Sequence, residues 1–218
     1  MAVHLIRDLE NLKKEILLLG GMVEEATENA ILALTDRRPE LAEKVLQGDK
    51  VVDAKEVQIE EECLKVLALH QPVAADLRYV VAMMKVNNDL ERVGDLAKNI
   101  AERAVSLAEA EPVSVPQGIT NMADDVRGML RDSLNAVVEL DTELAKTVHR
   151  QDENIDEAHK RIFRLIEERI RRDPERIHIH IQLLSVSRYL ERIADLATNI
   201  SEDVVFMVNG DVIRHQTV

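Results

Sequence analysis

A 13-residue sequence occurs twice in this chain, and this internal repeat constrains the fold more than any other feature. The first copy, LERVGDLAKNIAE, occupies residues 90–102, and the second, LERIADLATNISE, occupies residues 190–202. Nine of the 13 positions are identical, and the copies are 100 residues apart. Neither copy contains proline, and apolar residues recur in both at the three- and four-residue spacing of a helix. The repeat therefore predicts equivalent helices in two versions of one structural unit.

A second repeated pattern supports this duplication. Two series of aliphatic residues are spaced every seven positions and are offset by 103 residues: Val45, Val52 and Ile59, then Val148, Ile155 and Ile162. A seven-residue apolar spacing is typical of helices that pack along their length. Each copy of the unit therefore contains a helix of this kind before the helix that carries the 13-residue repeat.

Proline, glycine and polar clusters divide the chain into six expected helices. Their approximate bounds are 4–35, 39–69, 73–109, 118–140, 142–172, and Pro174 to about 209. Gly20 and Gly21 weaken the first helix and could bend it. The stretch AEPVSVPQG at 110–118 is the expected linker. The sequence thus predicts an all-α protein of two tandem three-helix bundles, residues 1–110 and residues 117–218, related by internal duplication.

The charge balance limits the partners that the surface can bind. The chain has 41 acidic and 28 basic residues, a formal net charge of −13, and only two Tyr, two Phe and no Trp. Such a surface repels nucleic-acid phosphates and anionic lipid, and it lacks the aromatic residues that stack on single-stranded bases. We therefore expect neither direct nucleic-acid binding nor membrane insertion. A cation or a basic patch on a protein partner suits this surface better.

The remaining sequence signals indicate a cytoplasmic protein. Cys63 is the only cysteine, which is consistent with a reducing compartment. Arg7 and Asp8 interrupt the N-terminal region before a secretory apolar segment could form. No uncharged apolar run approaches the ~18 residues expected of a membrane span. We expect a soluble cytoplasmic protein in which Cys63 is a small buried apolar residue.

The polar half of the 13-residue repeat could bind a metal ion. Glu91, Asp95 and Asn99 are spaced at i, i+4 and i+8, and Glu191, Asp195 and Asn199 repeat them. This spacing places each set on one helix face, roughly opposite the apolar residues. Carboxylate and amide oxygens are hard ligands that suit Mg, Ca, Mn or iron. In a single copy, such residues would usually form an ordinary solvated helix face, but both copies keep the three residues in register.

A second acidic set lies on the preceding helix of each unit. Asp49 and Asp53 are four residues apart, and Asp152 and Asp156 repeat this pair 103 residues later. They flank the seven-residue series, so they too could face outward. If the two helices of each unit are neighbours, they could jointly offer four carboxylates. The two units would still differ, because His159 occupies the position that corresponds to Glu56.

No sequence motif identifies an enzyme. The DEAH sequence at 156–159 has no accompanying G-x-x-x-x-G-K-[ST] loop to hold phosphates. Glu175 and His178 form one E-x-x-H pair, whereas di-iron bundles need two together with further glutamates. No nucleophile and base can be paired from the sequence.

These motifs together resemble the PhoU family of phosphate-uptake regulators along nearly the whole chain. The resemblance is carried by the paired L-E-R-[VI]-x-D-x-A-x-N-I sequences and by H-Q-P-x-A-x-D-L-R at 70–78. The D-x-x-[VI]-D segments at 49–53 and 152–156 and the V-x-G at 208–210 also fit. The resemblance implies two three-helix bundles in one α-helical protein that is often a homodimer.

The resemblance also implies a function. Members are cytoplasmic negative regulators of the phosphate-starvation response that connect a phosphate ABC transporter, through its ATPase, to a phosphate-responsive sensor histidine kinase. Some members bind iron or zinc clusters through E-x-x-x-D pairs. Carried over to this chain, those pairs are Glu91 with Asp95 and Glu191 with Asp195. The second-tier candidates are Asp49, Asp53, Asp152 and Asp156, followed by Asn99 and Asn199.

The chain departs from the family pattern at the candidate metal positions. Many relatives have histidine directly after the signature aspartate, where this chain has Leu96 and Leu196, and Ala194 replaces the glycine of the second signature. These departures leave ligation by oxygen alone. We expect a non-enzymatic adaptor whose acidic faces meet basic or metal-bearing surfaces. The alternatives are a metalloenzyme built on carboxylate clusters and a purely structural helical bundle.

Overall fold

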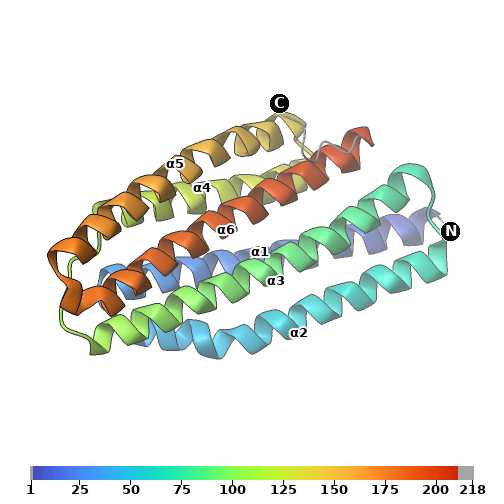
Figure 1. The fold of residues 1–218 in the computed structure, drawn as a ribbon. Coiled ribbons are helices and arrows are strands. Elements are labelled where there is room, and N and C mark those ends of the chain that lie inside the picture. Colours follow the sequence, from blue (N-terminus) through green and yellow to red (C-terminus); the bar gives the residue numbers. More distant parts are fainter. Residues whose placement is uncertain (1, 211–218) are drawn as a thin grey trace.

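The structure is a computed structural model that describes residues 2–210 (Figure 1). Within this range it contains six long α-helices, one 3-10 turn and no strand: α1 (Ala2–Thr35), α2 (Pro39–His70), α3 (Ala74–Glu109), α4 (Gln117–Glu139), α5 (Thr142–Arg172), η1 (Pro174–Arg176) and α6 (Ile177–Asn209). The predicted all-α class is confirmed. The predicted repeats 1–110 and 117–218 extend further at both ends, and residues 1 and 211–218 lie outside the described residues.

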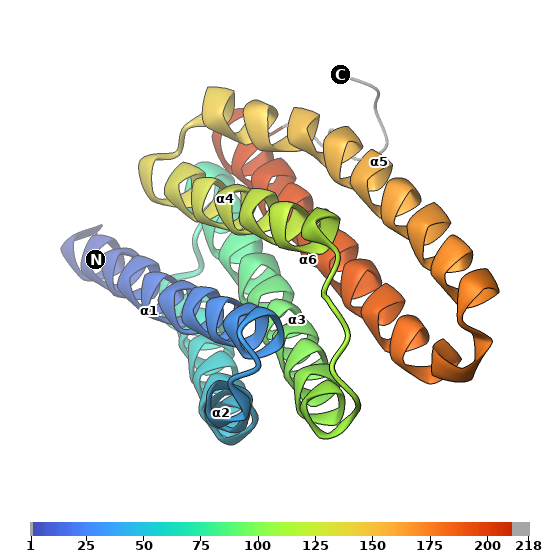
Figure 2. The ribbon, with the colours of Figure 1, turned by 90° about the vertical axis from the view of Figure 1, so that its left-hand side faces the viewer.

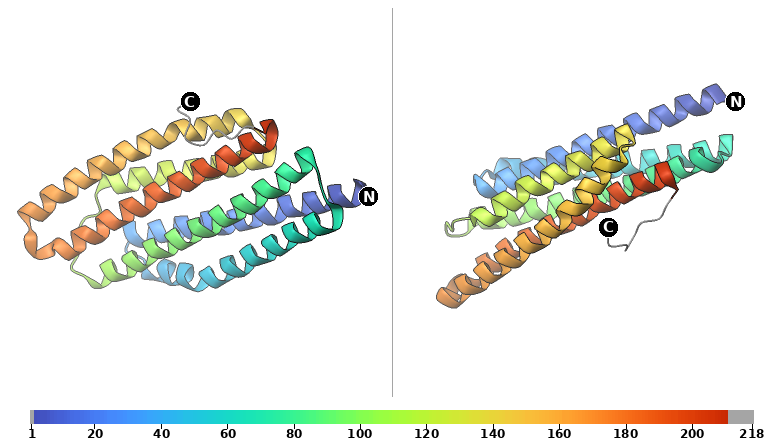
Figure 3. Two further views of the ribbon diagram at one scale, coloured as in Figure 1. Left: turned by 45° about the vertical axis from the view of Figure 1, so that its right-hand side comes forward. Right: turned by 90° about the horizontal axis from the view of Figure 1, so that it is seen from above.

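Each repeat forms a three-helix bundle, and the two bundles pack against each other. In the first repeat α1, α2 and α3 contact one another, and in the second α6 contacts both α4 and α5. The helices α3 and α6 lie side by side at the centre, and α1 packs on α4 (Figure 2). The α2–α3 turn and the α5–α6 turn lie at opposite ends of the molecule (Figure 3). The helices that carry the 13-residue repeat therefore form most of the contact between the two bundles.

The seven-residue apolar series lie in the core, as predicted. Val45, Val52 and Ile59 on α2 are buried, and so are Val148, Ile155 and Ile162 on α5. Burying one such side chain contributes about 1.5–3 kcal/mol. This burial explains why two strongly charged sequences form long helices with one face fixed toward their neighbours.

The apolar half of the 13-residue repeat is also buried in both copies. On α3, Leu90, Val93 and Ile100 have no exposed surface, and Leu190 and Ile193 match them on α6. Because the copies occupy the two central helices, one apolar pattern stabilises each bundle and its contact with the other bundle.

Three details differ from or add to the expected helix bounds. Pro174 begins the 3-10 turn η1, and α6 starts only at Ile177. The first helix runs unbroken through Gly20 and Gly21. A Cβ atom at Gly20 would lie 2.8 Å from Leu134 Cδ2 of α4. Gly20 therefore allows the close approach of the two bundles, a role that the sequence pattern did not indicate.

The linker between the bundles is held by arginines from both sides. Residues 110–116 have no regular secondary structure, so the linker predicted at 110–118 is present but ends two residues earlier, where α4 begins at Gln117. Arg37, in the α1–α2 turn, donates to the backbone oxygens of Leu107, Ala108 and Ala110 at 3.0–3.2 Å. These contacts place a cation at the carboxyl end of α3, where it is favoured by the helix dipole. Arg169 of α5 donates to the Ser114 oxygen at 2.9 Å.

No helix within residues 2–210 combines the length and the apolar character that a membrane span requires.

Candidate functional site

The acidic residues of the first repeat gather where α2 faces α3. Glu91 and Asp95 of α3 lie near Asp49, Asp53 and Glu56 of α2, and we call these five residues the first acidic cluster. Burial raises the pKa of the Glu91 carboxyl, and the negative charges of Asp95, Asp53, Glu56 and Asp49 raise it further. The two acidic pairs that are separate in the sequence therefore act on each other in the fold.

A lysine from the repeated signature provides a counter-charge within this cluster. Lys98 of α3 forms an ion pair with Asp49 of α2. The hydrogen bond to Asp49 raises the pKa of the Lys98 ammonium, and Asp95 and Asp53 raise it further. The Asp49 side chain is only 9% exposed. The expectation that the Asp49–Asp53 pair faces outward is thus wrong for Asp49, because its pairing with Lys98 draws it toward α3, while Asp53 is exposed.

The second repeat contains a corresponding group where α5 faces α6. Asp152 and Asp156 of α5 lie near Glu191 and Asp195 of α6, and these four residues form the second acidic cluster. Burial, followed by the charges of Asp195 and Asp156, raises the pKa of Asp152 to about 6. Partial desolvation and the charges of Glu191 and Asp156 likewise raise the pKa of the Asp195 carboxyl, although its side chain reaches the solvent. Folding therefore concentrates negative charge in a partly desolvated place.

The second cluster lacks the lysine that compensates the first. Thr198 occupies the position that corresponds to Lys98. Its side-chain hydroxyl is buried, and its hydrogen bond to Asp152 lowers the pKa of that carboxyl, but it brings no positive charge. The cations nearest to this cluster lie at its rim, where Arg188 pairs with Glu191 at 2.5 Å and Arg192 lies near Asp195. Asp152 therefore has no lysine partner of the kind that Asp49 has in the first repeat.

Two histidines that were not among the predicted site residues flank the second cluster. His149 Nδ1 lies 3.9 Å from Glu202 Oε1, and its charge would lower the pKa of Asp152. His159 Nε2 lies 4.0 Å from Glu191 Oε2. The expectation of ligation by oxygen alone, which rested on Leu96 and Leu196, did not include the imidazoles that α5 supplies. The exchange of Glu56 for His159 was the available sequence signal, but its position beside Glu191 depends on the α5–α6 packing.

The two asparagines of the repeat are less closely associated with the clusters. Both side chains are partly exposed. Asn199 lines a cavity between α3 and α6 together with Lys85, Asn88 and Arg92. Asn199 thus borders the contact between the bundles as well as following the Glu191–Asp195 pair on α6.

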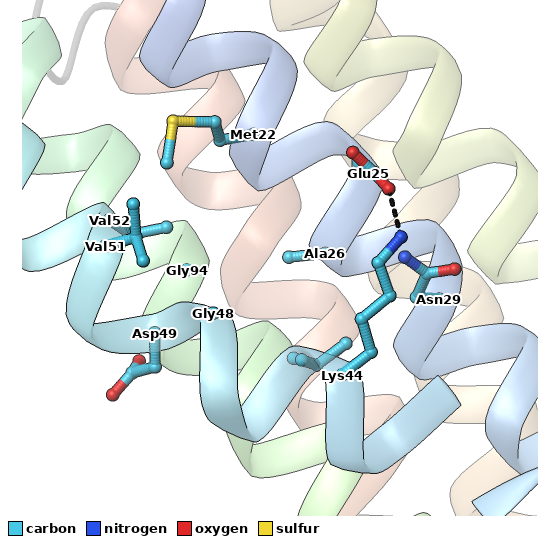
Figure 4. A pocket seen from close by; sticks show the side chains of 11 residues that line it. Met22, Glu25, Ala26, Asn29, Lys44, Gly48, Asp49, Val51, Val52 and Gly94 are labelled. Carbon is cyan, nitrogen blue, oxygen red and sulfur yellow. Dashed lines mark hydrogen bonds and ion pairs between the residues drawn. The ribbon is translucent and has the colours of Figure 1, made fainter. Parts of the chain in front are cut away.

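A separate apolar pocket opens beside the first cluster (Figure 4). It has a volume of about 150 Å³, and its lining includes Met22, Ala26, Val45, Val51, Val52 and Gly94. An ion pair between Lys44 and Glu25 lies at its polar side. The Asp49 carboxylate, which belongs to the cluster, points away from that pair in Figure 4. The lining supplies apolar contacts and no nucleophile–base pair.

The carboxylates of each cluster do not converge on a single point. Within residues 2–210, no group of three or more His, Cys, Asp or Glu side chains has a geometry that could hold one metal ion. Like charges that are not bridged by a cation repel, and exposed carboxylates such as Asp95 and Asp195 can turn toward water. The structure therefore brings the predicted residues to one face of each repeat without assembling a coordination sphere.

The same two repeats are found in known proteins. Residues 16–104 and 119–204 each match the PhoU domain. A "phosphate-specific transport system accessory protein PhoU homolog" of Aquifex aeolicus is 38% identical over 214 residues, covering 98% of this chain and 97% of that relative. A homolog of the same name in Caulobacter vibrioides is 39% identical over 210 residues, covering 96% of this chain and 91% of that relative.

Solved structures agree with this similarity. The crystal structure of PhoU from Pseudomonas aeruginosa is 34% identical in sequence and has a TM-score of 0.91, covering 94% of this chain and 99% of that chain. The phosphate transport system regulatory protein PhoU from Streptococcus pneumoniae has a TM-score of 0.86 at 30% identity, covering 95% and 98%. Since the domain matches both bundles and the relatives match along nearly their full length, this chain belongs to the PhoU family.

Proposed function

We propose that this protein is a cytoplasmic negative regulator of the phosphate-starvation response. The observation that carries this proposal is the match of both bundles to the PhoU domain, together with relatives named as accessory proteins of phosphate-specific transport. In the proposed role the protein is a non-enzymatic adaptor. It couples the ATPase of a phosphate ABC transporter to a phosphate-responsive sensor histidine kinase, and so modulates phosphate uptake.

The arrangement of polar groups supports an adaptor better than an enzyme. The acidic clusters lie at the surfaces of the α2–α3 and α5–α6 pairs, with Asp53, Asp95 and Asp195 exposed. A metalloenzyme that used these carboxylates would need an enclosed site with open coordination positions. A purely structural bundle would have no reason to concentrate charge around Asp152, whose pKa is raised to about 6.

The regulatory role is tested by deleting the gene in a strain that carries a phosphate-regulated reporter. We expect the reporter to be expressed at high phosphate after deletion and repressed again after complementation with the intact gene. Continued repression at high phosphate in the deletion strain contradicts the proposed regulation. A complementing variant with Glu91, Asp95, Glu191 and Asp195 changed to Ala separates the adaptor from a purely structural bundle. The adaptor should lose repression, whereas a structural bundle would repress normally with all four changes.

We also propose that the acidic faces bind metal, with iron or zinc as the candidate ions. The donor set suits a cation, because carboxylates that meet from α5 and α6 raise one another's pKa. A bound ion would supply the positive charge that neutralises these groups. Elemental analysis of the purified protein should find metal in the intact chain and much less in the fourfold Ala variant, with unchanged far-UV circular dichroism. A metal-free intact protein would refute this part and leave the adaptor role standing.

A homodimer is proposed as the assembled form. Val57 and Leu64 lie on the outer side of α2 and are each about half exposed. Exposed aliphatic side chains along one helix suit a contact with a second copy of the chain. Light scattering coupled to size-exclusion chromatography should give twice the mass of one 24.6 kDa chain. Replacing Val57 and Leu64 with Glu should shift the mass to that of a monomer.

A further inference from the structure

The apolar pocket between α1 and α2 has a counterpart in the second repeat whose lining is polar. The 103-residue offset that relates α2 to α5 also relates α1 to α4, because the two PhoU-domain matches begin at residues 16 and 119. At this offset the pocket residues Met22, Gly48 and Val51 correspond to Asp125, Gln151 and Asn154, which line a groove between α4 and α5. The hollow is thus shared by the two repeats, while its chemistry differs.

Two apolar side chains lie at the solvent edge of the pocket (Figure 4). Val51 is 58% exposed, and Met22 is partly exposed. The bundle itself does not require apolar residues at these positions, since α4 and α5 pack together with Asp125 and Asn154 in the same places. Apolar groups that surround a hollow are typical of a site that receives another molecule.

Gly48 keeps access to the pocket open at a cost to the helix that contains it. The residue lies in the interior of α2, where glycine is less favourable than almost any other residue. No atom lies within 4 Å of the position that a Cβ atom would take, so close packing does not require a glycine here. Since Gly48 lines the pocket, a long side chain in its place would reduce access to the hollow.

The volume of the pocket limits its occupant to a small apolar group. A cavity of about 150 Å³ admits a molecule the size of benzene, whereas sites for drug-sized ligands and cofactors measure roughly 300–1,000 Å³. The side chains of leucine, methionine and phenylalanine are close to benzene in size. One such side chain, inserted into a pocket by a protein partner, is the usual form of an energetically dominant interface contact.

The charges around the pocket favour a basic partner. Asp49 lines the pocket and also belongs to the first acidic cluster, whose five carboxylates exceed the positive charge that Lys98 supplies. The ion pair at the other edge, Lys44 with Glu25, has side chains that are 62% and 61% exposed, so it contributes little and exchanges readily. A segment that inserts an apolar side chain here therefore places its neighbouring residues beside the acidic cluster, where Lys or Arg is complementary.

We propose that the pocket between α1 and α2 receives one leucine, methionine or phenylalanine side chain from a basic segment of a protein partner. In this complex the inserted side chain contacts Met22, Ala26 and Val51, and neighbouring Lys or Arg residues of the partner contact Asp49 and Asp53. The inference rests on the proposed adaptor role and assigns one partner of that role to the first repeat. The second repeat has a polar groove at the equivalent place, so the two repeats differ in the partner that they accept.

The test measures binding of the full-length protein to the two proteins of its proposed role, the purified transporter ATPase and the purified sensor histidine kinase, by biolayer interferometry. We expect one of them to bind the double variant Met22→Asp, Val51→Asn at least about tenfold more weakly than the intact chain. Gly48→Gln, which introduces the residue of the second repeat, should weaken the same partner to a similar extent. Thermal unfolding should show that Gly48→Gln is no less stable than the intact chain, because glutamine favours the helix.

A matched change in the second repeat serves as the control. Gly128→Gln lies in the polar groove, again with no atom within 4 Å of the added Cβ, and it should leave both affinities unchanged. An equal loss of affinity in Gly128→Gln would overturn the assignment to the first repeat. Higher ionic strength should weaken binding of the pocket's partner, and an affinity that does not change with salt would overturn the basic character assigned to that partner.

The remaining outcomes separate the inference from the proposed function. If both pocket variants bind both proteins as tightly as the intact chain does, the pocket assignment is overturned while the adaptor role stands. If the intact chain binds neither protein, the inference and the adaptor role fail together. If the intact chain binds phosphatidylglycerol vesicles and the pocket variants lose only this binding, the pocket takes a lipid chain, and the assignment to a protein partner is overturned.

Discussion

Replacing Asp152 with asparagine should stabilise the metal-free protein at pH 8. Burial and the charges of Asp195 and Asp156 raise the pKa of the Asp152 carboxyl from its ordinary value of 3.8 to about 6, while a charged His149 and the Thr198 hydroxyl oppose part of this rise. The folded chain therefore holds the Asp152 proton more tightly than the unfolded chain does. Stability falls as the pH rises from about 4 to about 6, and the full penalty is present above that range.

The size of the effect follows from the difference between the two pKa values. A rise from 3.8 to about 6 corresponds to roughly 3 kcal/mol at ~1.4 kcal/mol per pH unit. Asp152 is only partly buried, so water screens part of this penalty. We expect Asp152→Asn to raise the free energy of unfolding by about 1–2 kcal/mol at pH 8. At pH 4 the carboxyl is mostly protonated in the folded chain, and the gain should fall to a few tenths of a kcal/mol.

The assay is urea unfolding followed by far-UV circular dichroism at pH 8 and pH 4, with a chelator present. Comparing the variant with the intact protein at each pH cancels the titration of the other carboxyls that the two share. The matched control is Asp49→Asn in the first repeat, which removes the ion pair with Lys98 and should lower stability by about 1 kcal/mol at pH 8. A gain for Asp152→Asn that is absent at pH 8, or equal at both pH values, refutes the reasoning.

Three further predictions concern packing and the thiol. Gly21→Ala should raise the free energy of unfolding by about 0.5–1 kcal/mol, because no atom lies within 4 Å of the added Cβ and alanine favours the helix. Gly20→Leu should lower the free energy of unfolding by about 1–3 kcal/mol, because the added side chain would overlap Leu134. Thermal unfolding compares the two glycine variants, and equal effects on stability would contradict the close approach of α1 and α4. Cys63 is buried, and its burial together with nearby glutamates raises the pKa of its thiol to about 12. A disulfide reagent at pH 8 should therefore modify the native protein roughly a thousandfold more slowly than the unfolded chain. Rapid modification of the native protein would show that Cys63 is accessible.

Most of the fold could be predicted because its signals are local. The seven-residue spacing of Val45, Val52 and Ile59 specifies which side of α2 is buried, and Pro39 specifies where that helix begins. The contribution of Gly20 could not be predicted in the same way. A glycine inside a helix usually weakens it. That Gly20 admits Leu134 of α4 became evident only when the two bundles were packed together.

The candidate site was predicted by residue type but not by pairing. The repeat identified Glu91, Asp95, Glu191 and Asp195, and their positions relative to α2 and α5 came from the structure. The outward expectation for Asp49 failed because its partner Lys98 is 49 residues away along the chain. Sequence spacing within one helix gives no information about the register between two helices.

The sequence by itself determined the helices, the duplication and the family, since apolar periodicity and repeated motifs are properties of the chain alone. Only the tertiary structure decided that Lys98 pairs with Asp49 of the first cluster, and that Thr198 and His159 lie beside Asp152 and Glu191 of the second. The physical reason is that contacts between helices depend on turn lengths and on core packing across the bundle. Those two factors, and not helical periodicity, set the height at which side chains of neighbouring helices meet.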